Sequence, residues 1–135
     1  MPQRWTTFFA AAVLVANLAC GAVPGVEDDQ VSSFEESLKQ AEQGEDDWSV
    51  LFGVGLGYAM GVGVMSYDGF EPVYRVPRNY VQAHKWFNLA ASRATDPTFA
   101  TLSADTRDLV ANNLSPDQLA EAERLAREWD EAHPR

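Results

Sequence analysis

The residue types that could perform chemistry are few and scattered in this 135-residue chain. The two histidines, His84 and His133, are far apart in the sequence, and the single cysteine, Cys20, lies near the N-terminus. A hydrolase needs a nucleophile, a base and an orienting group, or a metal with its ligands. We find no spacing that assembles such a set, so we predict no enzymatic activity, no metal and no cofactor. A small enzyme that depends on His84 is the alternative.

Two pairs of adjacent carboxylates could support acid–base chemistry, Glu35 with Glu36 and Asp46 with Asp47. Both pairs fall where helical patterns begin, and negative charge is stabilised at a helix N-terminus. We therefore interpret them as residues that start helices. The chain has 10 basic and 20 acidic residues, a net charge of −10. Such a surface repels nucleic acids and anionic lipid headgroups, and it suits solubility or a basic partner.

Residues 1–22 have the three regions of a secretory signal peptide. Arg4 precedes an apolar run over residues 6–19, and small residues follow around Cys20. The run is shorter than the roughly 20 residues that span a bilayer. We predict cleavage after Ala22 and export to the periplasm or cell envelope. Alternatively Cys20 is lipidated, because Leu18-Ala19-Cys20-Gly21 resembles a lipoprotein signal, or the segment stays as an uncleaved anchor.

Helical patterns begin after a linker over residues 23–31. Ser32 and Ser33 offer capping boxes for a first helix of about ten residues. Asp46 or Asp47 can cap a second helix over residues 48–60, whose interior glycines at 53, 55 and 57 each cost up to about 1 kcal/mol relative to alanine. Glycine leaves room for a neighbouring backbone or ring, so we predict that a second helix packs closely on this one.

Three further helices follow from the same kind of pattern. The third opens at Pro77 or Asn79 and has one face of Tyr80, Ala83, Trp86, Phe87, Ala90 and Ala91. His84 lies one place off that face and is predicted to be an ordinary surface or boundary residue. The fourth opens at Asp96-Pro97, with an apolar face of Phe99, Leu102, Leu109 and Val110. The fifth opens at Ser115-Pro116, with a face of Leu119, Ala122, Leu125, Ala126 and Trp129. No segment alternates with a period of two, so we predict an all-α domain over residues 32–135.

A loop over residues 65–76 separates the second and third helices, because Asp68-Gly69 is a turn dipeptide and Pro72 interrupts regular structure. The loop carries three aromatic residues, Tyr67, Phe70 and Tyr74. These rings either fold back over the helix pair or form a contact patch for a partner. They are the candidate partner-binding residues, with another protein or a peptide as the partner.

Residues 41–129 resemble the Sel-one-like repeat family, relatives of the tetratricopeptide repeats. The resemblance rests on two half-motifs in order, Val54, Gly55, Tyr58, Gly61 and Gly63, then Tyr80, Ala83, Trp86, Ala90 and Ala91. It implies an α/α helical-hairpin repeat, a short solenoid of about five helices in which the flanking helices act as caps. It also implies a non-catalytic role in protein–protein or peptide interaction in the bacterial envelope. The alternative is an envelope lipoprotein, anchored through Cys20, with a structural or cell-wall-associated role.

Overall fold

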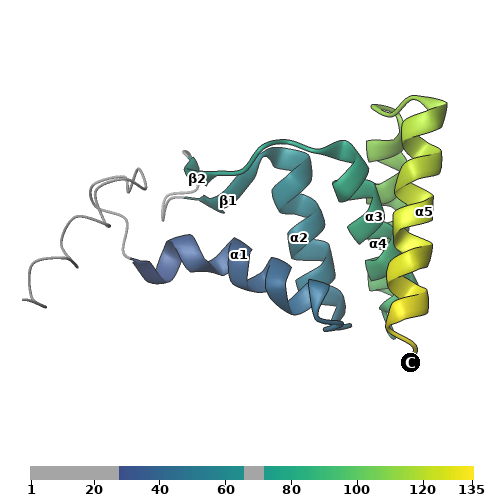
Figure 1. Ribbon diagram of the computed structural model, residues 1–135, viewed down its shortest axis with the longest axis horizontal. Coiled ribbons are helices and arrows are strands. Elements are labelled where there is room, and N and C mark those ends of the chain that lie inside the picture. The colour runs from purple at the N-terminus through teal and green to yellow at the C-terminus, as the bar shows by residue number, and fades with distance from the viewer. Residues whose placement is uncertain (1–27, 66–71) are drawn as a thin grey trace, which may run out of the picture.

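The computed structural model describes residues 28–65 and 72–135. The predicted signal peptide with Cys20, and the loop residues Tyr67 and Phe70, lie outside these ranges. The described elements are α1 (Asp28–Glu42), α2 (Trp48–Met60), β1 (Val62–Met65), β2 (Pro72–Arg75), α3 (Tyr80–Arg93), α4 (Pro97–Ala111) and α5 (Pro116–Ala132) (Figure 1). The prediction of five helices is confirmed.

Helix α3 is the centre of the fold, because α2, α4 and α5 all pack against it. Helix α1 packs on α2 and extends away from the other helices (Figure 1). The first and last helices meet where α1 ends, because the indole N–H of Trp129 in α5 donates a buried hydrogen bond of 2.9 Å to the carbonyl of Ala41 in α1. The first and last helices are therefore joined directly, as well as through α2 and α3.

Local sequence signals set the helix ends. Asp47 is the N-cap of α2, and Gly61 ends that helix in the left-handed conformation, at φ 69°, with its N–H bonded to the Gly57 carbonyl. Asn79 caps α3 through the backbone N–H of Gln82. Ser115 starts α5 with both bonds of a capping box to Gln118. The predicted starts of these helices are confirmed.

Two of the three interior glycines of α2 allow close packing, as predicted. A Cβ atom on Gly55 would come within 2.7 Å of the Phe87 ring of α3, and one on Gly57 would collide with the Phe34 ring of α1. Gly53 differs, because a Cβ there would meet nothing within 4 Å. Close approach therefore explains Gly55 and Gly57 and does not explain Gly53.

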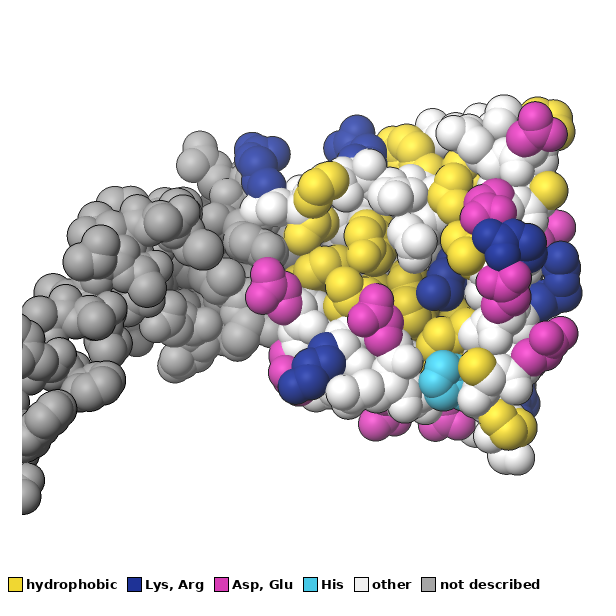
Figure 2. Space-filling view, in the orientation of Figure 1, with side chains coloured by type: hydrophobic (Ala, Val, Ile, Leu, Met, Phe, Trp, Pro, Cys, Tyr) yellow, Lys and Arg dark blue, Asp and Glu magenta, His cyan; other side chains and the backbone are white. Residues whose placement is uncertain are grey.

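The core lies on both sides of α3. Trp86 is 1% exposed and meets Trp129 edge-to-face, with ring centroids 6.0 Å apart. Phe87, on the adjoining side of α3, is fully buried under Gly55. Burying a large apolar side chain stabilises a fold by roughly 1.5–3 kcal/mol. Figure 2 shows further hydrophobic side chains between α1 and α5. Leu38 and Tyr58 are half-buried and pack against this core.

The remaining residues of the predicted repeat motif differ in how deeply they are buried. Val54 and Ala90 are buried with Trp86, while Ala83 is buried in a second cluster against which Tyr58 and Tyr80 pack. Ala91 is only half-buried and belongs to neither cluster. The hairpin of α2 and α3 therefore accounts for most of the predicted structural core.

Three predictions about the helices and the loop are wrong, and a fourth, about His84, is described with the site. Helix α1 already includes Asp28, so it overlaps the predicted linker and has 15 residues, not about ten. Ser32 and Ser33, predicted to cap this helix, and Glu35 and Glu36, predicted to start it, lie inside it instead. The acids Asp28 and Asp29 suit a helix start.

The predicted loop contains β1 and β2, an antiparallel pair with register irregularities, and Gly63 and Tyr74 lie in these strands. Four-residue strands are too short to display a clear alternating pattern. The third error, in α4, concerns the candidate site.

Candidate binding site on α4 and the helix N-termini

Helix α4 turns most of its predicted apolar face away from the core. Phe99, Leu102 and Leu109 are 44%, 45% and 68% exposed. Ser103 and Val110, each one position further along, are buried instead. In a helix, residues three, seven and ten positions after Phe99 lie on the same face as Phe99. Leu102, Thr106 and Leu109 are at these positions. We call Phe99, Leu102 and Leu109 the α4 stripe.

A hydrogen bond explains why the small Ser103 takes the inner position. The indole N–H of Trp48 donates to Ser103 Oγ at 2.6 Å, and Ser103 Oγ donates to the Phe99 carbonyl at 2.8 Å. Trp48 also stacks between two rings, Phe52 at 5.1 Å and Phe99 at 4.3 Å between centroids. The start of α2 and the start of α4 are therefore fixed to each other.

A pocket of about 540 Å³ opens beside this junction. Its lining comes from the α1–α2 connection, the first residues of α2, the α3–α4 connection and the first turn of α4. The lining residues are Asp46, Asp47, Trp48, Ser49, Arg93, Ala94, Thr95, Asp96 and Phe99. Phe99 belongs both to this pocket and to the α4 stripe, so the two features form one continuous surface.

Two of the pocket carboxylates are helix N-caps. Asp47 Oδ1 accepts the Ser49 N–H at 2.8 Å, and Asp96 Oδ1 accepts the Thr98 N–H at 2.7 Å. Hydrogen bonds from the side chain and then the backbone of Ser49 lower the pKa of Asp47. Asp47 is therefore ionised at neutral pH. A carboxylate that caps a helix through one oxygen keeps a second oxygen for another donor.

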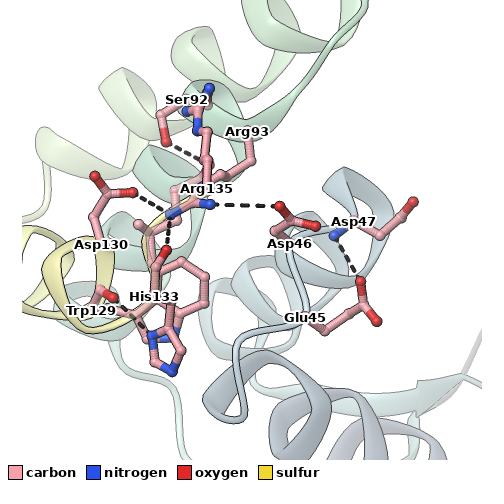
Figure 3. Close-up of polar contacts among 10 residues, drawn as sticks. Glu45, Asp46, Asp47, Ser92, Arg93, Trp129, Asp130, His133 and Arg135 are labelled. Atoms are coloured by element: carbon pink, nitrogen blue, oxygen red, sulfur yellow. Dashed lines mark hydrogen bonds and ion pairs between the residues drawn. The ribbon is translucent and has the colours of Figure 1, made fainter.

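Arg93, the last residue of α3, forms the inner wall of the pocket with a side chain that is 3% exposed. Its Nη2 donates to Asp130 Oδ1 at 2.6 Å and to the His133 carbonyl at 2.7 Å, and its Nη1 lies 3.5 Å from Asp46 Oδ2. Figure 3 shows Arg93 between these α5 groups and Asp46. Since two carboxylates already share its charge, Arg93 adds little positive potential to the pocket.

His84 is buried, at 3% exposure, so its prediction as a surface or boundary residue is wrong. The reason is that α3 is covered by three helices, and an off-stripe position is also enclosed. Its Nδ1 has no hydrogen-bond partner among the described residues. Burial lowers the pKa of His84, as does the charge of Arg107, while Glu123 and Asp108 oppose this. Within the described ranges, no group of three or more potential ligands is arranged to hold a metal ion.

The pocket and the α4 stripe were not found from the sequence. Of the predicted partner-binding residues, Tyr67 and Phe70 lie outside the described residues. Tyr74 lies in β2, which is separated from α4 in the sequence by the whole of α3. The pocket joins residues 46–49 with residues 93–99, which are separated by an entire helical hairpin. The available signal was the repeated pattern of a capping aspartate close to an aromatic residue, in Asp47-Trp48 and in Asp96 with Phe99.

Comparisons with family models, curated proteins and solved structures give no match for this chain. In the described parts of the chain, none of the helices combines the length and apolar character needed to cross a membrane.

Proposed function

We propose that this chain is a non-catalytic helical-repeat protein that binds another protein or a peptide through α4, after export to the bacterial envelope. The observation that carries the proposal is the α4 stripe. Three large apolar side chains stand in a row on the outer face of a helix whose inner face packs on α3. Contiguous exposed apolar groups on a folded domain mark interaction surfaces.

The shape of the stripe favours a helical partner. An amphipathic helix presents apolar residues at the same three- and four-residue spacing, so its side chains can lie along Leu102 and Leu109. Removing these groups from water stabilises a complex by about 25 cal/mol for each Å² of apolar surface that is buried. In our proposal α2 and α3 form one repeat of the Sel-one-like kind, and the flanking helices α1, α4 and α5 act as its caps.

The arrangement of the pocket carboxylates favours a role in binding over a role in acid–base catalysis. Asp47 and Asp96 cap helices, and Asp46 pairs with Arg93, so each has a structural role in the fold. A general acid or base needs a pKa matched to its task and a free approach to a substrate proton. The lowered pKa of Asp47 moves away from neutrality, which disfavours that role.

Photo-crosslinking in cells tests the proposal. The full chain carries p-benzoylphenylalanine at Leu102, and a matched copy carries it at Arg127, an exposed residue of α5. We expect a discrete adduct from position 102 and none from position 127. Adding Leu109→Glu to the first copy should remove the adduct without loss of helicity, because this residue is exposed. The absence of any adduct from position 102 would contradict the proposal.

A companion variant addresses the aromatic loop residues predicted from the sequence. Alanine at Tyr67, Phe70 and Tyr74 should leave the adduct from position 102 intact if α4 alone forms the contact. Loss of the adduct in this triple variant, with an unchanged circular dichroism spectrum, would extend the binding surface to the connection between β1 and β2.

A further inference from the structure

We infer that the segment bound by α4 is basic, and that one of its lysine or arginine side chains enters the pocket between the N-termini of α2 and α4. This inference rests on the proposed function and specifies the chemistry of the partner. The apolar residues of the segment lie along the α4 stripe, and the cationic side chain extends past Phe99 into the pocket.

Continuity is the first argument. Phe99 lies at the first turn of α4, where it contributes to the pocket wall, and Leu102 and Leu109 follow along the same face. A single helical segment on the stripe therefore has one end at the mouth of the pocket. A long flexible side chain at that end can reach the carboxylates while its methylene groups contact the Phe99 ring.

Charge is the second argument. The pocket lining holds three carboxylates, Asp46, Asp47 and Asp96, against one guanidinium, Arg93. The Arg93 charge is already shared by Asp46 and by Asp130 of α5. Each of the two helix N-termini adds about half a positive charge, which still leaves the lining negative. The pocket therefore attracts a cation and repels the carboxylate of a peptide C-terminus. The Phe99 ring, which is 44% exposed, adds a favourable interaction with a cation.

Charge also favours a basic segment of another protein over a second copy of this chain as the partner. A second copy of this chain also has a net charge of −10. Like charges across an interface disfavour association. A basic amphipathic segment of another protein supplies both the apolar residues and the opposite charge.

Synthetic peptides test the inference. The probe is an amidated 15-residue helical peptide with leucines at three- and four-residue spacing and one lysine at the end that faces the pocket. The control peptide has norleucine in place of that lysine. Binding to the full chain is followed by NMR, through the backbone amides of Ser49 and Thr98 and the indole N–H of Trp48. We expect the lysine peptide to bind about tenfold more tightly, since hydrogen bonds to charged groups are the stronger kind.

The protein variant is Asp47→Asn with Asp96→Asn. Asparagine is as good an N-cap as aspartate, so both helices keep their caps while two charges are lost. This variant should bind the two peptides equally. The matched control, Asp117→Asn with Glu131→Gln on α5, also loses two charges and should keep the tenfold preference.

Equal binding of both peptides by the unmodified chain would overturn the inference. So would loss of the preference in the α5 control, or the absence of amide shifts with either peptide at millimolar concentration. None of these results bears on the crosslink from position 102, which tests the proposed function independently.

Discussion

Trp48 and Ser103 are 55 residues apart in the sequence, yet the indole N–H of one donates to the hydroxyl of the other at 2.6 Å. This bond fixes the start of α2 to the middle of α4, and it helps to select which face of α4 is turned inward. The orientation of the α4 stripe, and with it the proposed binding surface, therefore rests in part on this polar contact, together with the packing of α4 on α3.

Replacing Ser103 with alanine should destabilise the fold. The Trp48 N–H would lose its acceptor, and leaving such a donor unsatisfied costs roughly 1–3 kcal/mol. For a domain of this size, each kcal/mol corresponds to a fall in Tm of roughly 4–8 °C. Thermal unfolding followed by circular dichroism measures the change. Thr106→Ala, which removes an exposed hydroxyl bonded within α4, is the control and should alter Tm little. Equal effects of both variants would contradict the role of the Trp48 contact.

Alanine substitutions in α2 should have opposite effects at two glycines. Gly55→Ala places a methyl group 2.7 Å from the Phe87 ring, and overpacking of this kind typically destabilises by about 1–3 kcal/mol. Gly53→Ala meets open space, so the helix should gain up to about 1 kcal/mol from the better helix former. Urea denaturation gives both values. A stabilising Gly55→Ala would show that α2 and α3 are not in close contact there.

Stability should fall as His84 becomes protonated. Its pKa is lowered in the folded chain, mainly by burial, from the ordinary value of 6.5. The unfolded chain therefore binds the proton more readily, and folded stability is complete above pH 6.5 and declines as the pH falls from there toward the folded pKa. Denaturant midpoints between pH 7.5 and 5 measure the slope. His84→Leu should flatten it. An unchanged slope in this variant would refute the assignment.

The proposed export predicts a defined N-terminus. Intact-mass analysis of the protein recovered from the envelope should give a chain that begins with a free Val23, because residues 1–22 have the composition of a cleaved signal peptide. A mass that retains Cys20 with two or three acyl chains would instead favour the lipoprotein alternative. Retention of the complete segment would indicate an uncleaved anchor.

The sequence predicted the helices well and their contacts less well. Asp47, Asn79, Asp96 and Ser115 are local signals, since each cap depends on residues no more than three positions away. The face of α4 that packs on α3 is not a local property. The pattern of apolar residues places Val110 inward correctly, but it also favours Leu102 and Leu109 over the small Ser103, which is the buried residue.

His84 shows the same limit for α3. A helix with one buried stripe would leave this residue at its margin, but α3 is contacted from three directions. The pocket could not be predicted from short sequence patterns either. Its two lining segments approach each other only when the whole hairpin of α2 and α3 has formed.

The hydrogen bond between the Trp129 indole and the Ala41 carbonyl affects how this protein unfolds. Linear stacks of helical units commonly fray from their outer members, because each unit is held only by its neighbours. Here α1 and α5 are bonded directly to each other, so the separation of either helix also breaks this buried hydrogen bond. We expect a single cooperative unfolding transition, without a populated intermediate in which α1 or α5 has detached.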